Sequence, residues 1–354
     1  MLYYIQFMKK KNYIDFNKDT YSNPETKKAY QDRAKNVSEY EWTDEQWKQF
    51  FILRAGVNKN SKVLELGPGS GRMLAILASL AKNTTAVEFA MGDIAKEKSP
   101  TSTVIEQNIL DVELPEGEFD VIYAGAFIHM FSSHDLAHKV MPSISEWLKP
   151  GGKFIFTTTL HEKHAEGIFA KEDYEGQMPR FRNKMTRHDI SDVLMSGDMM
   201  PEEFYGKGER DRDKLWILAI AEKSPEHLRN TDEERNEILA RIDDPNHVHT
   251  DDLNQSIRRI MRYDSALWVA PNKPLEQYTI SELEDALRNV QKRSERSKLN
   301  TMYSAIEEGV KMLAHSGEEH LLPKGFDTLT FNMVEKAIQK SPKAQQKYFG
   351  AKIS

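Results

Sequence analysis

The chain has 354 residues, of which 39% are hydrophobic and 10% aromatic, and its 49 basic and 55 acidic residues give a net charge of −6. This apolar content excludes a disordered chain and can build a buried core, and the length suggests about two domains. The acidic balance argues against a broad nucleic-acid-binding surface but leaves room for a local basic patch. Because cysteine is absent, disulfides, thiolate catalysis and cysteine-ligated zinc are excluded.

The sequence also bears on where the protein is located and on whether it crosses a membrane. A chain without cysteine fits a reducing compartment, so we expect a cytoplasmic location, although export is also compatible with it. No apolar run approaches the ~20 residues of a membrane-spanning helix, and we expect no membrane partner. The start, Met1–Lys10, has its charges after its apolar residues, the reverse of a secretory signal. We interpret it as a packing arm or a frayed terminus.

Helices are expected at the N-terminus. Residues 25–40 have the pattern of a polar helix, and Thr43–Gln46 matches a capping box that begins a second one. We expect residues 1–60 to form a helical segment or lid. Tyr30 and Trp47 belong to such a lid or, more simply, to core packing.

Strands then alternate with helices. This alternation implies crossover connections and a mostly parallel sheet, so the expected fold class is α/β with helices on both faces of the sheet. Helices are predicted at 73–80, 136–148 and 186–197. The predicted strands are residues 62–66, 84–88, 104–108, 119–123, 153–157 and 213–221.

The character of the chain changes after Ser224-Pro225. Residues 224–354 are helical and charged in pattern, and Thr231–Glu234 is another capping box. We expect a helical C-terminal domain, which completes the active site, forms a homodimer or binds a partner. The predicted helices are residues 232–242, 251–263, 279–293, 298–315 and 330–340.

The first functional signal is a glycine-rich turn between a strand and a helix. Its residues are Glu65-Leu-Gly67-Pro-Gly69-Ser-Gly71. Glycines there allow positive φ and let a ligand approach the backbone closely. Glu88 ends the next strand, where a carboxylate can accept hydrogen bonds from both hydroxyls of a ribose. The spacing differs from the G-x-G-x-x-G fingerprint of dinucleotide-binding domains, and a glycine loop that only makes a tight turn is the simpler alternative.

The order of the motifs resembles the class I S-adenosylmethionine-dependent methyltransferase family. The resemblance covers residues 25–223 and not the C-terminal third. It implies a Rossmann-like fold, S-adenosyl-L-methionine as cofactor and methyl transfer as activity. The matching segments are Glu65–Gly71, Glu88, Gln107–Asp120 and Trp147–Phe154.

The resemblance also implies roles for single residues. Gly67 and Gly69, in the motif that Gly71 closes, would approach the methionine part of the cofactor, Glu65 would lie near its amino group, and Glu88 would hold the ribose.

Further along the chain, Asn108 would meet the adenine amino group, with the Ile109 amide near the ring. Ala124 would lie near the reactive methyl group. Many relatives have Asp where Asn108 stands, and the Asn carbonyl oxygen can still accept a hydrogen bond.

Two histidines are candidate general bases. His129 follows the fourth predicted strand and His161 the fifth, at the sheet edge where ligands bind in such folds. Histidine titrates near neutrality and can take the proton that leaves an acceptor. The alternative is that each histidine only fixes its loop.

Substrate contacts are predicted in the segment after the fifth strand. Tyr174, Arg180 and Arg182 could seat a carboxylate or phosphate, with ordinary surface salt bridges as the alternative. Residues Asp243–Asp252 contain histidines and carboxylates, but a solvated loop explains them equally simply, and we expect no metal.

The leading hypothesis is an enzyme that methylates an O or N atom of a small molecule or peptide. The alternatives are a protein or RNA methyltransferase whose helical C-terminal domain recognises the substrate, and a non-catalytic cofactor-binding scaffold. The acidic balance disfavours a nucleic-acid partner.

Overall fold

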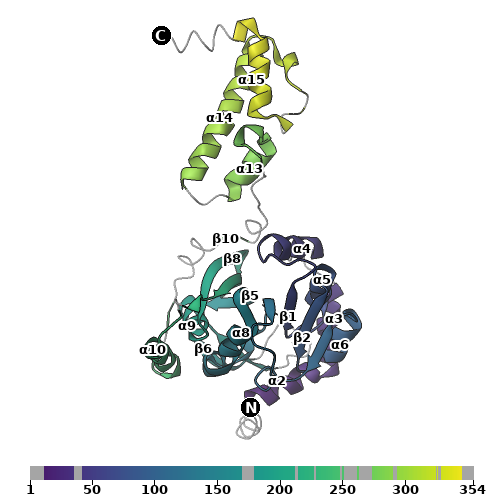
Figure 1. Ribbon diagram of the computed structural model, residues 1–354, viewed down its shortest axis with the longest axis vertical. Helices are drawn as coiled ribbons and strands as arrows, with labels where there is room; N and C mark the ends of the chain where they lie inside the picture. The colour runs from purple at the N-terminus through teal and green to yellow at the C-terminus, as the bar shows by residue number, and fades with distance from the viewer. Residues whose placement is uncertain are drawn as a thin grey trace. The chain divides into compact units, whose positions relative to one another are not determined.

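The computed structural model describes residues 12–35, 42–169, 179–211, 214–226, 229–247, 249–250, 261–262, 273–289, 293–323, 325 and 328–344. The chain divides into two compact units, Met1–Leu267 and Trp268–Ser354. The first is an α/β unit, and the described part of the second is helical (Figure 1).

The α/β unit is built on an eight-stranded sheet with the order β10-β8-β9-β5-β4-β1-β2-β3. From β3 to β5 the neighbouring strands are parallel, while β9 is antiparallel to both β5 and β8. The predicted mostly parallel, Rossmann-like sheet is confirmed. The strands are β1 (Lys62–Leu66), β2 (Asn83–Glu88), β3 (Thr103–Glu106), β4 (Phe119–Gly125), β5 (Leu148–His161), β8 (Met199–Asp211), β9 (Lys214–Lys223) and β10 (Met261–Arg262).

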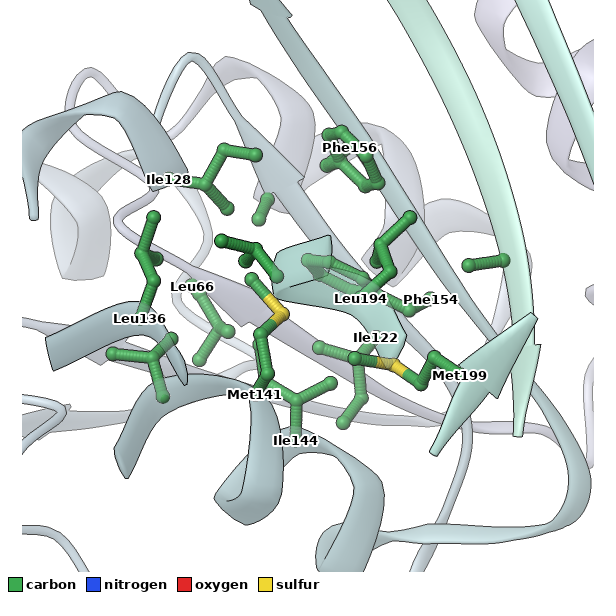
Figure 2. Close-up of a cluster of buried hydrophobic side chains, with 14 of the residues drawn as sticks. Leu66, Ile122, Ile128, Leu136, Met141, Ile144, Phe154, Phe156, Leu194 and Met199 are labelled. Carbon is green, nitrogen blue, oxygen red and sulfur yellow. The ribbon is translucent and has the colours of Figure 1, made fainter. Parts of the chain in front are cut away.

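Helices cover both faces of this sheet because its central strands are apolar on both sides. Leu64 and Leu66 belong to one buried cluster and Val63 to the other, as the alternation of side chains along a strand requires. Figure 2 shows the first cluster, where Met141 and Ile144 pack against the sheet. This face is covered by the π-helical segment η2 (Leu136–Val140), α8 (Met141–Trp147) and α9 (Arg187–Ser196), and the short helix α7 (Ser133–Asp135) precedes η2.

The opposite face is covered by α4 (Asp44–Leu53) and α5 (Arg72–Leu80). The predicted capping box begins α4, with both Thr43–Gln46 hydrogen bonds formed. Trp47, Phe50 and Phe51 of this helix are buried, and Trp47 packs against Tyr123 of β4 with ring centroids 6.0 Å apart. Trp47 is therefore a core residue.

The N-terminal residues form a helix that the sequence pattern did not predict. α2 (Tyr13–Ser22) precedes α3 (Pro24–Lys35) and packs against β7 (Arg180–Lys184), which pairs with β6 (Ala165–Phe169) in a separate two-stranded sheet. The Phe181 amide donates to Asn17 Oδ1 at 2.9 Å, and Asn17 Nδ2 donates to the Met130 carbonyl at 3.3 Å. These bonds attach α2 to the carboxyl-end side of the sheet.

The second unit packs helices around its own apolar core, which includes Leu283, Ile306, Leu313 and Val334. Its long helix and the last one approach closely at Gly309, where an added Cβ would lie 2.3 Å from Val334 Cγ1. The elements are α13 (Ile280–Asn289), α14 (Arg293–His315), α15 (Phe331–Lys340), η4 (Leu275–Gln277) and η5 (Glu319–Leu321).

The region between the sheet and the second unit differs from the predicted pattern. α10 (Asp232–Asp243) forms as predicted and packs on α9, so it belongs to the α/β unit although it follows residue 224. The predicted helix 251–263 is wrong at Met261–Arg262, which pair with β8 as β10, while 251–260 and 263 lie outside the described residues. The three-part division 1–60, 61–223 and 224–354 stays a prediction. Among the described residues, no helix is long and apolar enough to cross a membrane.

Candidate active site

The glycine loop after β1 has the backbone that its sequence predicts. Gly67, Gly69 and Gly71 have φ of 65°, 53° and 73°. An added Cβ would meet Phe127 Cδ2 at 2.4 Å at Gly67 and Lys98 Cβ at 2.9 Å at Gly71. At Gly69 the nearest atom would be the Gly67 carbonyl oxygen at 4.0 Å. Gly67 and Gly71 are therefore required by packing, whereas Gly69 borders open space that a ligand can fill.

Glu88 is held by the backbone around it. Its Oε1 accepts hydrogen bonds from the amides of Phe89, Ala90 and Met91 at 2.8, 2.8 and 3.1 Å. Its Oε2 accepts one from the Gly69 amide at 2.9 Å. A carboxylate oxygen has two acceptor sites, so Oε2 retains capacity for a ligand hydroxyl.

A cavity opens where β1, β2, β3 and β4 end. Parallel strands deliver their carboxyl ends to one edge of the sheet, and ligands bind there in open α/β folds. The walls combine loop residues with Ile14, Asn17 and Tyr21 of α2 and with Tyr30 of α3. Of the predicted cofactor residues, the cavity is lined by Gly67, Gly69, Glu88, Asn108 and Ile109.

Glu65 lies in β1 beside this group and is 2% exposed. Burial, reinforced by the nearby Glu88 carboxylate, raises the pKa of Glu65 well above its ordinary value. Its Oε2 is buried and has no hydrogen-bond partner within the described structure. A buried, unsatisfied carboxyl oxygen fits a cationic amino group, which is the role that the resemblance implies.

Two of the residues predicted to hold adenine, Asn108 and Ile109, lie in the cavity wall, and their role stays a prediction. Asn108 lines the cavity, and its Oδ1 also accepts from the Leu110 amide at 3.2 Å. Ala124, by contrast, is fully buried in β4, and the next two residues, Gly125 and Ala126, line the cavity in its place. Ala126 has a positive φ of 53°, and both the carbonyl oxygen and Oγ1 of Thr157 accept from its amide at 2.9 Å. Such strained backbone at a strand end is typical of functional sites.

The two predicted catalytic histidines are buried. His129 is 5% and His161 7% exposed, and neither is among the described cavity-lining residues. His129 Nδ1 lies 3.1 Å from Thr158 Oγ1, and His161 Nε2 lies 3.0 Å from Thr159 Oγ1. These contacts connect both rings to β5.

The predicted substrate residues of β7 act on the cavity through Tyr21. Arg182 Nη2 donates to the Tyr21 hydroxyl at 2.9 Å, and Arg180 is 4% exposed. Burial opposes ionisation of the Tyr21 phenol, but the Arg182 and Arg180 guanidinium groups outweigh it and lower its pKa. Neither arginine is among the described lining residues, and Tyr174 lies outside the described residues.

Sequence reasoning missed Tyr21 and Asn17 because no motif marks them. Both gain their place through contacts with β7, which is more than 150 residues away in the chain. The one available signal was the apolar spacing of Tyr13, Phe16 and Tyr21, and it was not interpreted as a helix.

Comparison with known proteins finds similarity within the α/β unit. Residues 64–156 match the family described as a methyltransferase domain, so the α/β unit contains such a domain. Protein-L-isoaspartate O-methyltransferase of Dechloromonas aromatica is 27% identical over 117 residues, which are 33% of this chain and 53% of that protein. Phosphoethanolamine N-methyltransferase of Plasmodium falciparum is 32% identical over 108 residues, 28% of this chain and 40% of that protein.

The chain spans about half the length of the curated relatives it matches. Among solved structures, a S-adenosylmethionine-dependent methyltransferase from Clostridium acetobutylicum is 16% identical with a TM-score of 0.43. The match covers 52% of this chain and 94% of that one.

Proposed function

We propose that this chain, whose residues 64–156 form a methyltransferase domain of the S-adenosylmethionine-dependent class, methylates an O or N atom of a small molecule or peptide. The observation that carries the proposal is the cavity at the strand ends. It brings five residues of the predicted cofactor motifs together with aromatic side chains from α2 and α3. Such a combination can hold a cofactor and a second molecule side by side.

The residues present fit S-adenosylmethionine. The unsatisfied Oε2 of Glu65 would receive the amino group, and Gly69 leaves its Cβ position open for the methionine part. Glu88 would hold the ribose, and Asn108 with Ile109 the adenine. When bound, the cofactor supplies an electrophilic methyl group.

The remaining task of the protein is to align the acceptor and keep water out. Tyr21, Tyr30, Phe127 and Phe131 provide an aromatic wall beside the motif residues. Holding the acceptor in line within such a wall converts an encounter into an effectively intramolecular step, which lowers the barrier to methyl transfer.

Tyr21 is the best-placed proton acceptor. Methylation of a hydroxyl or a protonated amine requires a proton to leave, and Tyr21 is a residue of the cavity wall. The Arg182 guanidinium donates to it and stabilises its phenolate form, so the lowered pKa of Tyr21 increases the fraction of phenolate, the form that can accept a proton. His129 and His161 stay the competing candidates.

We also propose that the acceptor carries a carboxylate or phosphate. Arg180 and Arg182 place two positive charges behind the Tyr21 side of the wall, and Tyr174 precedes them in the same segment. Two relatives, one named as an O-methyltransferase and one as an N-methyltransferase, leave both acceptor atoms open. A cytoplasmic location and a homodimer through residues 224–354 are further proposals of ours.

The test is to incubate the full chain with methyl-labelled cofactor and fractionated metabolites and peptides, and to identify the labelled product. Gly69→Val serves as the control that should give no label. Cofactor binding without transfer to any fraction would favour the scaffold alternative, and label in protein or RNA would favour the macromolecular one.

A further inference from the structure

A second group of chemically active side chains lies in the α/β unit outside the cofactor cavity. His134 of α7, His138 of η2 and Asp243 at the end of α10 converge there. His134 Nδ1 lies 2.8 Å from Asp243 Oδ1, and His138 Nε2 lies 2.9 Å from Asp243 Oδ2. One carboxylate thus faces two imidazole nitrogens at once.

The backbone arranges the two histidines as a pair. They are four residues apart on continuous helix, which places them on one face, and their ring centroids are 4.3 Å apart. His138 lies in the π-helical segment, a local widening that recurs at functional sites. Asp243 reaches them from a different helix, so the group depends on tertiary packing rather than on one local pattern.

The distances suit a metal ion. The three ligand atoms all lie within 4.8 Å of one another. Zn²⁺ binds imidazole nitrogen and carboxylate oxygen at about 2.0–2.2 Å, so the ligand atoms of a tetrahedral ion lie roughly 3.3 Å apart. The two nitrogen–oxygen pairs, at 2.8 and 2.9 Å, are near that spacing. Exposed fractions of 62%, 30% and 39% for His134, His138 and Asp243 leave the group open to an ion from solvent.

The surroundings favour a cation. His134 and Asp243 also line a cavity that shares no lining residue with the cofactor cavity. Its described walls hold five carboxylates against Arg241 and His164, whose pKa is raised by Asp189, so the carboxylates outnumber these cationic groups and lower the local potential. Those carboxylates are Glu166, Asp189, Asp192, Asp243 and Asp244.

We propose that His134, His138 and Asp243 bind a divalent transition-metal ion of the zinc type. Two imidazoles with one carboxylate select such ions over Mg²⁺ or Ca²⁺, which prefer oxygen ligands alone. The ion joins the end of α10 to the helix that begins at Ser133. Three protein ligands leave the fourth position of a tetrahedral ion to water or to a molecule in the adjoining cavity.

The test is calorimetric titration of Zn²⁺ into the full chain after dialysis against a chelator. We expect one site per chain, and a melting temperature that rises with Zn²⁺ and falls again with chelator. His138→Ala and Asp243→Asn should each weaken binding at least tenfold. Near-ultraviolet circular dichroism confirms that these exposed substitutions leave the fold intact.

His249→Ala is the matched control. His249 lines the same cavity and lies 3.3 Å from a carboxylate oxygen of Asp192, but it is outside the three-ligand group. Its loss should leave Zn²⁺ affinity within about twofold of wild type. Absence of Zn²⁺ binding by the wild-type chain overturns the proposal, and so does binding that depends on His249 but not on His138.

Discussion

The Gly69 amide donates a 2.9 Å hydrogen bond to Oε2 of Glu88, joining the loop after β1 to the end of β2. The two residues predicted to hold different parts of the cofactor are thus one hydrogen-bonded unit. A change at either residue therefore affects the geometry of the other, and each variant needs a control that separates local folding from binding.

For Glu88→Ala, we expect cofactor binding to weaken by about 1.5–3 kcal/mol, the scale for hydrogen bonds to a charged group. Isothermal titration calorimetry gives the affinity. Glu106→Ala, which removes an exposed carboxylate at the end of the adjacent strand β3, is the control and should bind normally. Equal affinities for the two variants would mean that the ribose is held elsewhere.

Gly69→Val should abolish measurable cofactor binding, because a branched side chain fills the open space at this position. The substitution also imposes a left-handed backbone on valine, at a cost of about 1–2 kcal/mol. Gly117→Val carries the same strain, since Gly117 has φ of 60° and an added Cβ would meet nothing within 4 Å. Both variants should lose similar unfolding free energy, and only Gly69→Val should lose affinity.

The raised pKa of Glu65 predicts that cofactor binding releases a proton. Because its folded pKa is raised, the free protein keeps this carboxyl protonated at pH values between the ordinary and the raised pKa. A cationic amino group beside it reverses the shift, so binding in that window releases a proton. Titrations in buffers of different ionisation enthalpy should show the release in wild type and its loss in Glu65→Gln.

The raised pKa of Glu65 also predicts how the free energy of unfolding changes with pH. In that window the folded chain binds a proton that the unfolded chain does not, so stability falls as pH rises through the folded pKa of Glu65. Urea unfolding of the cofactor-free protein at several pH values measures this. Glu65→Gln should flatten that part of the profile, and an unchanged profile would contradict the assignment.

Tyr21→Phe should lower turnover by about 10²–10⁴-fold, the usual contribution of a general base, with cofactor affinity largely kept. In wild type the rate should rise with pH through the lowered pKa of Tyr21, and the variant should lack this limb. Tyr13→Phe is the control. Tyr13 lies on the same helix, but its hydroxyl contacts Asp135 and Ser132 and it is not among the described lining residues.

The histidine hypothesis predicts a different outcome. If His129 or His161 is the base, one of the two single variants, His129→Ala or His161→Ala, slows turnover by about 10²–10⁴-fold, and the other does not. Tyr21→Phe would then keep its pH-dependent limb. Near-normal turnover in all three variants would leave alignment of the acceptor as the whole contribution of the protein.

Gly309→Ala tests the packing of the second unit. Alanine in a helix normally gains about 1 kcal/mol over glycine, but overpacking a close contact costs about 1–3 kcal/mol. With Val334 Cγ1 at 2.3 Å from the added Cβ, we expect a net loss of stability. Thermal unfolding measures it, and adding Val334→Ala should recover part of the loss. Stabilisation by Gly309→Ala alone would show that α14 and α15 do not pack as described.

Local patterns predicted those parts of the molecule that depend on neighbours in sequence. The glycine loop before α5, the Thr43 capping box and the central strands all follow from residues within a few positions of one another. The Glu88 side chain likewise sits at a strand end that the alternation of elements locates.

Features that depend on contacts between distant segments of the chain could not be predicted from the sequence. Residues 261–262 form a strand because β8 offers an edge, against the helical pattern around them. Tyr21 reaches the site because Arg182 and Asn17 connect α2 to β7. Asp243 meets His134 and His138 across more than 100 positions of chain, which no spacing rule detects.

The attachment of α2 bears on how fast ligands exchange. Part of the cavity wall is this helix, and a few hydrogen bonds of Asn17, Tyr21 and Tyr13, each worth about 1 kcal/mol, attach it to the rest of the unit. Opening of the helix therefore requires far less energy than unfolding the sheet. Residence time of a bound cofactor would then depend on the contacts of α2, those of Asn17 among them, as well as on Glu88. Loss of the Asn17 amide would speed association and dissociation together, leaving the equilibrium constant less changed than either rate.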